Sequence, residues 1–298
     1  MPLKQQELIT LVKAALAEDI GRGDMTSLSC LEPFSVKAEI IAKSEGILSG
    51  LNPALLAFHI VDSANNVTLF KRDGGSFKPG DIIAKIDGFN QTVFASERVA
   101  LNFIGHLSGV ATLTNKFVKK VEQAGYSGCK IIDTRKTLPG LRALQKQAVV
   151  DGGGVNHRQG LYDMILIKDN HIAACGSISK AIELLNENIE TPEFHLQFDL
   201  HKDEIEIEVE ISNEEQLREA IDCGVKRLLL DNQSVDKLTN LTRLARSLSD
   251  DLKLEASGNV SLENVADIAA TGVDYISVGA LTHSAPSADF SLNVTDPK

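Results

Sequence analysis

The chain has 298 residues, enough for one large or two medium domains with a well-buried core. Its 43% hydrophobic and 24% charged residues are typical of a globular protein. The formal net charge of −11 argues against a general nucleic-acid-binding or anionic-membrane surface, because such a partner would be repelled. Any anionic ligand must therefore be met by a local group of basic residues.

Two features of the sequence predict a cytoplasmic protein. The N-terminus, MPLKQQELITLVKAAL, predicts an amphipathic helix over Gln5 to Glu18 and lacks the apolar core of a signal peptide. No apolar run approaches the roughly 20 residues that span a bilayer.

The four cysteines have neither zinc-ligand spacing nor the pattern of a disulfide scaffold, so we expect reduced and mostly buried thiols at Cys30, Cys129, Cys175 and Cys223.

The first part of the chain, residues 1–109, predicts a mixed domain of helices and short strands. Extended runs at residues 36–42, 67–71 and 82–86 are separated by Gly and Pro turn signals. From Ser96, apolar residues at helical spacing predict a helix that passes Lys120, is interrupted by Gly105 and Gly109, and joins two domains. We place the second domain at residues 110–284 and expect the tail, residues 285–298, to pack on the first.

After Gly125, short apolar strands alternate with helices, which predicts βα units and a parallel sheet. Helices are expected at residues 213–223, with Asn213 as the N-cap, and at residues 261–270. The six expected strands are residues 130–133, 164–168, 205–211, 227–231, 252–256 and 275–278. Six strands fit an incomplete or distorted βα barrel better than a complete barrel of eight, and an open doubly wound sheet remains the alternative.

One expected strand, EIEIEVEI over residues 204–211, has an acidic residue at every second position. Alternation gives this strand one apolar face and one carboxylate face. A solvated edge strand accounts for Glu204 and Glu206 as well as a functional role does. Glu210 lies at the carboxyl end of the strand and is a stronger candidate for a functional residue.

The residues that follow the expected strands form a chemically coherent set, and the carboxyl ends of parallel strands are where ligands bind in α/β folds. Small residues after the last two strands suit a phosphate held by main-chain N–H groups. Ordinary βα turns are the alternative for each of these short segments taken alone. The set comprises Thr134, Arg135, Lys136, Lys168, Glu210, Asp231, Ser257, Gly258, Asn259, Val278, Gly279 and Ala280.

Residues 133–171 form a basic island in the acidic chain. It has more positive charges than one bound monophosphate would require, which suggests a diphosphate or a dicarboxylate as the ligand. The run Gly152-Gly153-Gly154 matches no nucleotide-binding fingerprint and is interpreted as a flexible loop that lets His157 and Arg158 reach the ligand. The six Lys or Arg residues are Arg135, Lys136, Arg142, Lys146, Arg158 and Lys168.

Glu210 and Asp231 would lie opposite these cations. Carboxylates there can coordinate Mg²⁺ on a diphosphate, accept hydrogen bonds from sugar hydroxyls or stabilise a developing carbocation. This mixture favours transfer at a phosphorylated sugar. Salt bridges to the same basic residues are the alternative for the acidic pair.

Eight sequence motifs, each present once, are spread over most of the chain. In chain order they are AEDIGRGDMTS, SERVALNFIGHLSGVAT, DTRKTLPGLR, GGGVNHRQGLYDMILIKDNH, EVE, LLLDN, EASGNV and GVDYISVGALTHSAPSADFSL. Together they resemble the quinolinate phosphoribosyltransferases, the decarboxylating nicotinate-nucleotide pyrophosphorylases. The resemblance implies an N-terminal open-faced α/β sandwich and a C-terminal distorted, incomplete barrel. It also implies a homodimer, or a higher oligomer, whose active sites are shared between subunits.

The resemblance implies transfer of phosphoribosyl from 5-phosphoribosyl 1-diphosphate to quinolinate with loss of CO₂, with Mg²⁺ and without an organic cofactor. A related phosphoribosyltransferase acting on another acid is the closest alternative. A Schiff-base aldolase with Lys168 as nucleophile fits poorly, because Asp169 and the expected phosphates surround that lysine. A non-catalytic anion-binding module would leave Glu210 and Asp231 unexplained.

Site residues carry over from the resemblance motif by motif. It implies that Arg98 from the partner subunit, together with Arg135, His157, Arg158 and Lys168, binds the carboxylates of quinolinate. It assigns phosphates to Lys136, Lys168 and the loops at residues 257–259 and 278–280. Glu210 and Asp231 would face the ribose and Mg²⁺, directly or through the diphosphate. The implied catalytic residues are Lys136, Glu210 and Asp231.

The sequence departs from the family pattern at a few places. The acidic stretch at residues 186–204 is longer than the usual link before EVE. Gln145 and Gln147 replace residues that the family often has as Glu and Tyr. Both glutamines lie outside the ligand cluster, so we expect them to affect helix packing and the surface rather than the chemistry.

Overall fold

The computed structural model describes residues 5–198 and 205–296, which form two compact units. The first unit contains the chain up to Asn115, Lys136–Gly154 and the residues from Ala280 onward. The second contains Lys116–Arg135 and Val155–Gly279. The prediction joined only residues 1–109 and the tail, residues 285–298, whereas the first compact unit also takes in Lys136–Gly154, a segment of the basic island.

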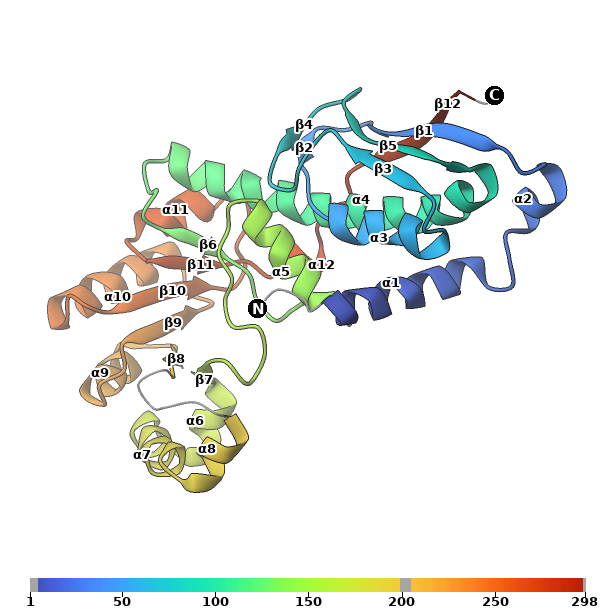
Figure 1. Ribbon diagram of the computed structural model, residues 1–298. Coiled ribbons are helices and arrows are strands. Elements are labelled where there is room, and N and C mark those ends of the chain that lie inside the picture. Colours follow the sequence, from blue (N-terminus) through green and yellow to red (C-terminus); the bar gives the residue numbers. More distant parts are fainter. Residues whose placement is uncertain (1–4, 199–204, 297–298) are drawn as a thin grey trace. The chain divides into compact units, whose positions relative to one another are not determined.

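The first unit is built on an antiparallel sheet with the strand order β12-β1-β5-β3. Alternate residues of β1, among them Val36, Ala38 and Ile40, are buried against a shared core with α1, α3 and α4. These helices cover one face of the sheet (Figure 1), which gives the open-faced sandwich that was expected. The elements are α1 (Gln5–Ile20), α2 (Met25–Cys30), β1 (Ser35–Ala42), β2 (Gly46–Ile47), α3 (Leu51–Val61), β3 (Asn66–Leu69), β4 (Ser76–Phe77), β5 (Ile82–Phe89), α4 (Asn90–Gln123), α5 (Arg142–Asp151), α12 (Ala280–His283) and β12 (Phe290–Asp296).

The long helix α4 is continuous through Gly105 and Gly109, so the predicted interruption is wrong. The two glycines instead allow close approach by the segment that leads into β12. A Cβ on Gly109 would overlap with the carbonyl of Pro286, and a Cβ on Gly105 would lie 2.9 Å from the carbonyl oxygen of Ala288. The Ala288 N–H also donates to the Gly105 carbonyl at 2.9 Å. The glycines therefore serve a contact between distant segments.

The second unit contains the six predicted strands in one parallel sheet, with the order β6-β11-β10-β9-β8-β7. This order follows the chain around a circle that is open between β6 and β7. A doubly wound sheet would reverse its order at a switch point, so the incomplete barrel is confirmed over that alternative. The strands are β6 (Lys130–Ile132), β7 (Ile165–Ile167), β8 (Ile207–Ile211), β9 (Arg227–Asp231), β10 (Lys253–Ser257) and β11 (Tyr275–Ser277).

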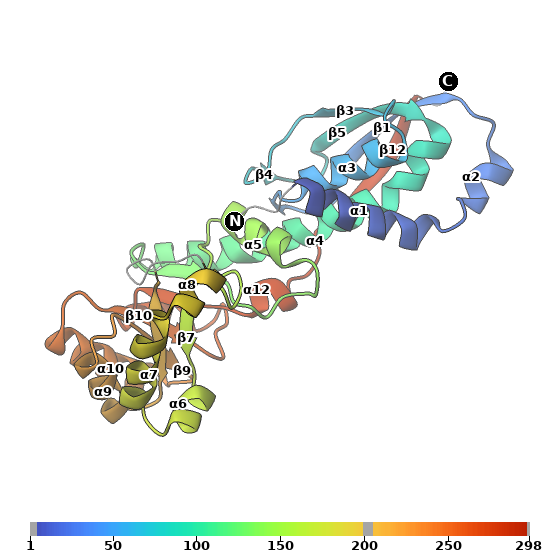
Figure 2. The ribbon, with the colours of Figure 1, turned by 60° about the horizontal axis from the view of Figure 1, so that its bottom comes forward.

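Helices α7, α9, α10 and α11 form a row in which each packs against the next (Figure 1), and Figure 2 shows the first three of them from another side. The predicted N-cap of α9 is confirmed, since Asn213 Oδ1 accepts a hydrogen bond of 2.9 Å from the Gln216 N–H. Helix α11 begins four residues later than predicted, after a turn at residues 261–264. The helices of this unit are α6 (Asp169–Cys175), α7 (Ile178–Ile189), α8 (Pro192–Phe198), α9 (Glu214–Asp222), α10 (Val235–Leu248) and α11 (Val265–Ala270).

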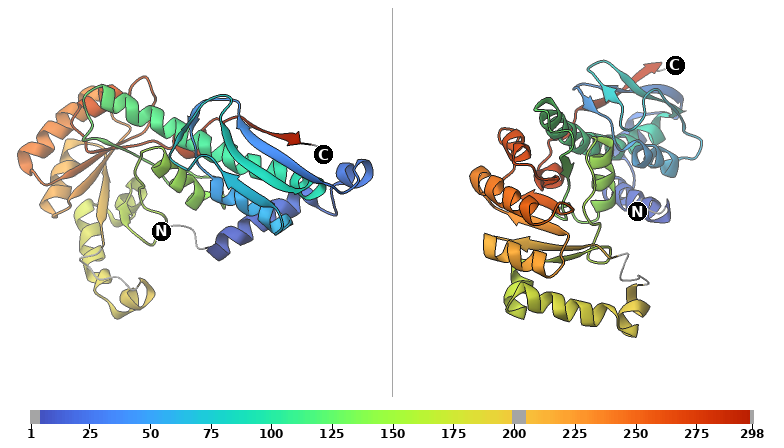
Figure 3. Two further views of the ribbon diagram at one scale, coloured as in Figure 1. Left: turned by 45° about the horizontal axis from the view of Figure 1, so that its top comes forward. Right: turned by 90° about the vertical axis from the view of Figure 1, so that its left-hand side faces the viewer.

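The strand with alternating acids, β8, lies inside the sheet between β7 and β9 (Figure 3). Its interpretation as a solvated edge strand is therefore wrong. Glu208 is fully buried and Glu210 is 8% exposed. Glu206 is the exposed carboxylate of the strand, and Glu204 lies outside the described residues.

The structure tests the prediction of reduced and mostly buried cysteines. All four cysteines are free thiols, but only Cys129 is buried, and Cys30 is exposed, so the prediction of mostly buried thiols is wrong. Burial raises the pKa of the Cys129 thiol to about 12, which keeps it unreactive. No helix in the described part of the chain combines the length and the hydropathy needed to cross a membrane.

Candidate active site

The carboxyl ends of the six strands bring most of the predicted site residues to one edge of the second unit. Asp231, Ser257 and Ser277 pair in register across β9, β10 and β11. Lys168 follows β7 directly, and its Nζ lies 3.2 Å from Glu210 Oε2 on the neighbouring strand β8. The predicted residues of this unit are Thr134, Arg135, His157, Arg158, Lys168, Glu210, Asp231, Ser257, Gly258, Asn259, Val278 and Gly279.

The remaining predicted residues belong to the first unit. Arg98 is exposed on α4, Lys136 is exposed, and Ala280 begins α12. The basic island is divided in the same way, because Arg142 and Lys146 lie on α5. Lys146 is only 1% exposed, so it belongs to the interior of the first unit rather than to a ligand surface.

Two guanidinium groups lie close together in the second unit. Arg158 is 9% exposed and donates from Nη1 to the Met164 carbonyl at 3.2 Å. Burial and the positive charge of Arg135 lower the pKa of Arg158. Arg135 Nε is buried without a hydrogen-bond partner among the described residues, an arrangement that costs free energy in the isolated chain. An anionic ligand would relieve both the repulsion and the unsatisfied donor.

The loops after β9 and β10 are braced against each other. Asn232 and Asn259 have positive φ angles of 51°, and Gly258 has a φ of 95°. The Asn232 N–H donates to the Ser257 carbonyl at 2.9 Å, and Asn259 Nδ2 donates to Asn232 Oδ1 at 3.3 Å. A Cβ on Gly258 would overlap with the Asn232 side chain, so this position requires glycine. Left-handed residues in such turns direct main-chain N–H groups toward an anion.

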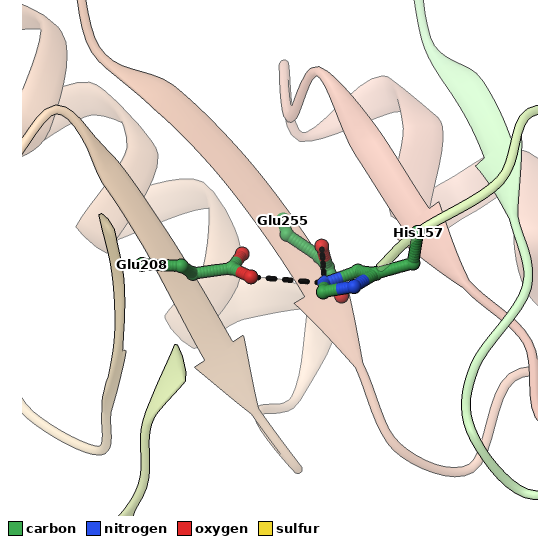
Figure 4. A group of neighbouring side chains, drawn as sticks. All are labelled: His157, Glu208 and Glu255. Atoms are coloured by element: carbon green, nitrogen blue, oxygen red, sulfur yellow. Dashed lines mark hydrogen bonds and ion pairs between the residues drawn. The ribbon is translucent and has the colours of Figure 1, made fainter. Parts of the chain in front are cut away.

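Below this edge lies a group that we call the buried ion cluster: His157, Glu208, Arg227 and Glu255. Figure 4 shows the His157 ring pointing Nε2 toward both carboxylates, at 2.9 Å from Glu208 Oε2 and 3.4 Å from Glu255 Oε2. Arg227 bonds to the same carboxylates, through Nε to Glu208 and Nη2 to Glu255, each at 3.1 Å. Its guanidinium also lies 4.7 Å from the centre of the Tyr275 ring.

The pKa values of the buried ion cluster follow from its contacts. Burial and the charge of Glu255 raise the pKa of Glu208. Burial alone would raise the pKa of Glu255, but its bonds to His157 and Ser277 and the charge of Arg227 lower it overall. Burial alone would lower the pKa of Arg227, whereas the charge of Glu208 and the bond to Glu206 raise it. The charges of the cluster are therefore mutually dependent.

Sequence reasoning missed Glu208, Arg227 and Glu255. The available signals were the first Glu of the EVE segment, the Arg that begins the strand RLLLD, and the Glu inside the otherwise apolar segment LEA. Charged residues in the interior strands of a parallel sheet are rarely buried unless they are paired. That reasoning would have marked all three as members of a buried network.

Two groups of side chains could be considered as ligands for a metal ion. The ligand atoms of His157, Glu208 and Glu255 lie within 4.8 Å of one another, but Arg227 already neutralises both carboxylates. Glu210 and Asp231 are carboxylates near the ends of the adjacent strands β8 and β9 and lie on the same face of the sheet. Mg²⁺ prefers one or two carboxylates completed by substrate phosphates, so this second pair fits a magnesium diphosphate.

Comparison with protein families matches nearly the whole chain in two parts. Residues 24–108 match the family model described as quinolinate phosphoribosyl transferase, N-terminal domain. Residues 110–293 match the model described as quinolinate phosphoribosyl transferase, C-terminal domain.

Individual relatives and solved structures agree with the family match. The chain is 44% identical over 289 residues to a probable nicotinate-nucleotide pyrophosphorylase (carboxylating) of Bacillus subtilis, covering 97% of this chain and 94% of the relative. It is 38% identical over 279 residues to a protein of the same description from Synechocystis, covering 94% and 90%. The structure of the nicotinate-nucleotide pyrophosphorylase from Francisella tularensis superposes with a TM-score of 0.88 at 36% identity, covering 98% of each chain.

Proposed function

Because the chain belongs to the quinolinate phosphoribosyltransferase family, we propose that the strand-end edge of its second unit binds quinolinate and phosphoribosyl diphosphate. The enzyme transfers phosphoribosyl from 5-phosphoribosyl 1-diphosphate to quinolinate with decarboxylation. The products are nicotinate mononucleotide, diphosphate and CO₂, and the reaction belongs to NAD biosynthesis. The observation that best supports the site is the neighbouring pair Arg135 and Arg158, in which the buried Nε of Arg135 has no hydrogen-bond partner within residues 5–198 and 205–296.

Quinolinate carries two adjacent carboxylates, which need a concentrated positive charge. Arg135 and Arg158 offer planar forks that suit carboxylates, and Lys168 adds a point charge at the end of β7. His157 directly precedes Arg158 and belongs to the same site. A monocarboxylate would leave part of this charge unbalanced, so the pair favours a dicarboxylic acid.

The phosphates of phosphoribosyl diphosphate would lie over the small residues that end β10 and β11. Ser257, Gly258 and Asn259 form one braced loop, and the other is formed by Val278, Gly279 and Ala280. Main-chain N–H groups in these loops suit phosphate oxygens. Thr134 and Lys136, which flank Arg135, complete the set with a hydroxyl and a second ammonium group.

The chemistry begins with attack of the pyridine nitrogen on C1 of the ribose as diphosphate leaves. Glu210 and Asp231 face the side where positive charge develops on the sugar and can stabilise its oxocarbenium character. When bound, Mg²⁺ would neutralise the leaving diphosphate, and these two carboxylates are the residues suited to hold it. Lys168, whose Nζ contacts Glu210, orients that carboxylate.

Decarboxylation follows on the mononucleotide of quinolinate. The bond between C2 and its carboxylate breaks, and the electron pair stays at C2 next to the cationic ring nitrogen. CO₂ leaves and a proton takes its place at C2. The remaining carboxylate stays bound by the arginine pair, so the ring does not shift between the two steps.

We infer further that the active enzyme is a cytoplasmic homodimer in which Arg98 of one subunit reaches the site of the other. Arg98 is exposed on α4 and stands in the SERVALN segment on which the family resemblance rests. It would add a third guanidinium to the dicarboxylate site.

The proposal is tested by incubating purified protein with Mg²⁺, quinolinate carrying a ¹⁴C label in its 2-carboxylate and phosphoribosyl diphosphate. Labelled CO₂ and diphosphate should be released in equal amounts. The Arg135→Ala variant should bind quinolinate about 10- to 100-fold more weakly, because a charged hydrogen bond of about 1.5–3 kcal/mol is lost.

The matched control is Arg218→Ala, which removes an arginine whose bond is to Glu214 on the exposed face of α9. It should leave both products unchanged. Folded wild-type protein that releases no CO₂ would contradict the function, and faster turnover of a pyridine monocarboxylate would favour a related enzyme with another acid as substrate.

A further inference from the structure

His157 has both ring nitrogens engaged within the protein. Nδ1 accepts a hydrogen bond of 2.7 Å from the main-chain N–H of Arg158. Nε2 faces Glu208 and Glu255 in the buried ion cluster (Figure 4). The side chain is 7% exposed. A direct hydrogen bond from this ring to a substrate carboxylate would require breaking one of these contacts.

The Arg158 contact also fixes the tautomer of the ring. Nδ1 needs a lone pair to accept from the Arg158 N–H, so the ring hydrogen is on Nε2. Burial by itself lowers the pKa of His157, but the bonds to Glu208 and Glu255 and their charges raise it to about 9, which favours a second proton on the ring. The Arg158 N–H, 2.7 Å from Nδ1, opposes that second proton, because a protonated Nδ1 cannot accept a hydrogen bond. The contact geometry therefore leaves a single ring hydrogen, on Nε2. The carboxylates therefore hold the Nε2 hydrogen firmly and fix the plane of the ring.

The chain on either side of the ring is anchored as well. The main-chain N–H of His157 donates to Asp133 Oδ1 at 3.0 Å, and Asp133 is fully buried at the end of β6. Beyond the ring, Arg158 donates from its guanidinium to the Met164 carbonyl. The imidazole is thus a rigid connection between the buried ion cluster and the main chain of Arg158.

We propose that Glu208, Glu255 and Arg227 are positioning residues that act through His157 to hold Arg158 in the geometry that binds the substrate dicarboxylate. Arg227 fixes the two carboxylates, the carboxylates fix the ring, and Nδ1 fixes Arg158. His157 accordingly serves the site through Arg158 rather than by touching quinolinate. This inference rests on the proposed function of the same site.

The first test compares Glu208→Gln with Glu206→Gln. Both carboxylates bond to Arg227, Glu208 from β8 and Glu206 from the position directly before it, but the Glu206 side chain is 54% exposed and does not contact His157. Glu208→Gln should raise the KM for quinolinate about 10- to 100-fold, with a smaller change in kcat, because a displaced Arg158 weakens binding before chemistry begins. The KM for phosphoribosyl diphosphate should stay within about twofold, and Glu206→Gln should change neither constant.

A double-mutant cycle identifies the route of the effect. If Glu208 acts through Arg158, adding Glu208→Gln to Arg158→Ala should weaken quinolinate binding by less than about twofold more. Fully additive effects would overturn the proposal. So would a folded Glu208→Gln protein that behaves like Glu206→Gln, or one that loses affinity equally for both substrates. Glu255→Gln is judged by the same criteria.

A measurement on the wild-type enzyme tests the proposal even if the Glu208→Gln and Glu255→Gln variants fail to fold. Nitrogen-15 NMR of the histidine side chains should assign to His157 an unprotonated Nδ1 and a slowly exchanging Nε2 hydrogen, in the free and in the quinolinate-bound state. An Nδ1 hydrogen in the bound state would exclude the hydrogen bond from the Arg158 N–H, on which the proposed route depends, and would overturn the proposal. Wild-type protein that neither binds quinolinate nor releases CO₂ would instead contradict the proposed function.

Discussion

Asp73 is a carboxylate of the first unit that remains accessible to solvent, and its ionisation opposes folding. Its Oδ1 accepts from the Leu51 N–H at 3.3 Å, at the start of α3. Burial, followed by the charge of Asp151, raises the pKa of Asp73 to about 6, although bonds from Leu51 and Gly50 act in the opposite direction. The folded pKa thus lies above the ordinary value of 3.8. The stabilisation is fully present below about pH 4 and is lost as the pH rises through about 6.

Asp73→Asn should therefore stabilise the protein at neutral pH. The amide keeps the acceptor for Leu51 without the charge. Because solvent screens the charge of an exposed carboxylate, the free energy of unfolding should rise by only about 0.5–1 kcal/mol at pH 8, and by less at pH 4.5. Urea denaturation at both pH values measures the difference. Asp87→Asn, on the exposed face of β5, is the control and should show no such dependence on pH. Equal stabilities of Asp73→Asn and wild type at pH 8 would contradict the argument.

For individual residues, the sequence predicted which side chains follow the strands at the binding edge. It did not predict the buried ion cluster inside the sheet. A period of two assigns Glu208 and Glu210 to one face of β8. It does not say whether that face is turned to water or closed by neighbouring strands. That depends on the sheet order, through which Arg227 and Glu255 arrive on β9 and β10. The buried ion cluster could therefore not be predicted from the sequence, because its members come together only through the order of the strands.

Helix α5 holds three segments of the first unit together through one glutamine. Gln145 Oε1 accepts from the Leu138 N–H at 2.9 Å, and its Nε2 donates to the Thr282 carbonyl at 2.6 Å. The same Nε2 lies 2.9 Å from His106 Nε2, and burial lowers the pKa of that histidine, which favours the neutral ring as acceptor. The Thr282 hydroxyl in turn donates to the Lys136 carbonyl at 2.7 Å.

Gln145→Ala should lower the free energy of unfolding by about 2–4 kcal/mol, because it leaves buried partners unsatisfied and opens a cavity. Gln147→Ala is the matched control on the same helix. Gln147 is exposed and bonds through Nε2 to Asp151, so its loss should cost less than about 0.5 kcal/mol. Thermal and urea denaturation measure both. Similar losses for the two variants would contradict the role of Gln145.

The helices and strands were the part of this fold that the sequence predicted best. Apolar runs and periodicity located all six strands of the barrel and the helices α1, α4 and α9, because these patterns are local. The errors concern contacts between distant segments. Gly105 and Gly109 were interpreted as an interruption of α4, whereas they accommodate the segment at residues 286–288. The expectation that Gln145 affects helix packing agrees with its contacts.

At the scale of the whole molecule, the cations of an acidic chain are divided between the two compact units. Arg135, Arg158 and Lys168 belong to the second, and Arg98 and Lys136 belong to the first. An exposed Arg98 on α4 has a specific use if it completes the site of a second subunit. In a dimer with two-fold symmetry, each site would then take Arg98 from one chain and Lys168 from the other.

Mixing two inactive variants tests this arrangement. Arg98→Ala and Lys168→Ala should each be nearly inactive alone. After unfolding, mixing in equal amounts and refolding, half of the dimers contain one chain of each kind. In those dimers one site carries both substitutions and the other carries neither, so CO₂ release should recover to about a quarter of the wild-type rate. A chain with both substitutions should restore nothing to either single variant, because every site in a mixed dimer would lack at least one of the two cations. No recovery in a mixture that contains mixed dimers would mean that each site is built within one chain.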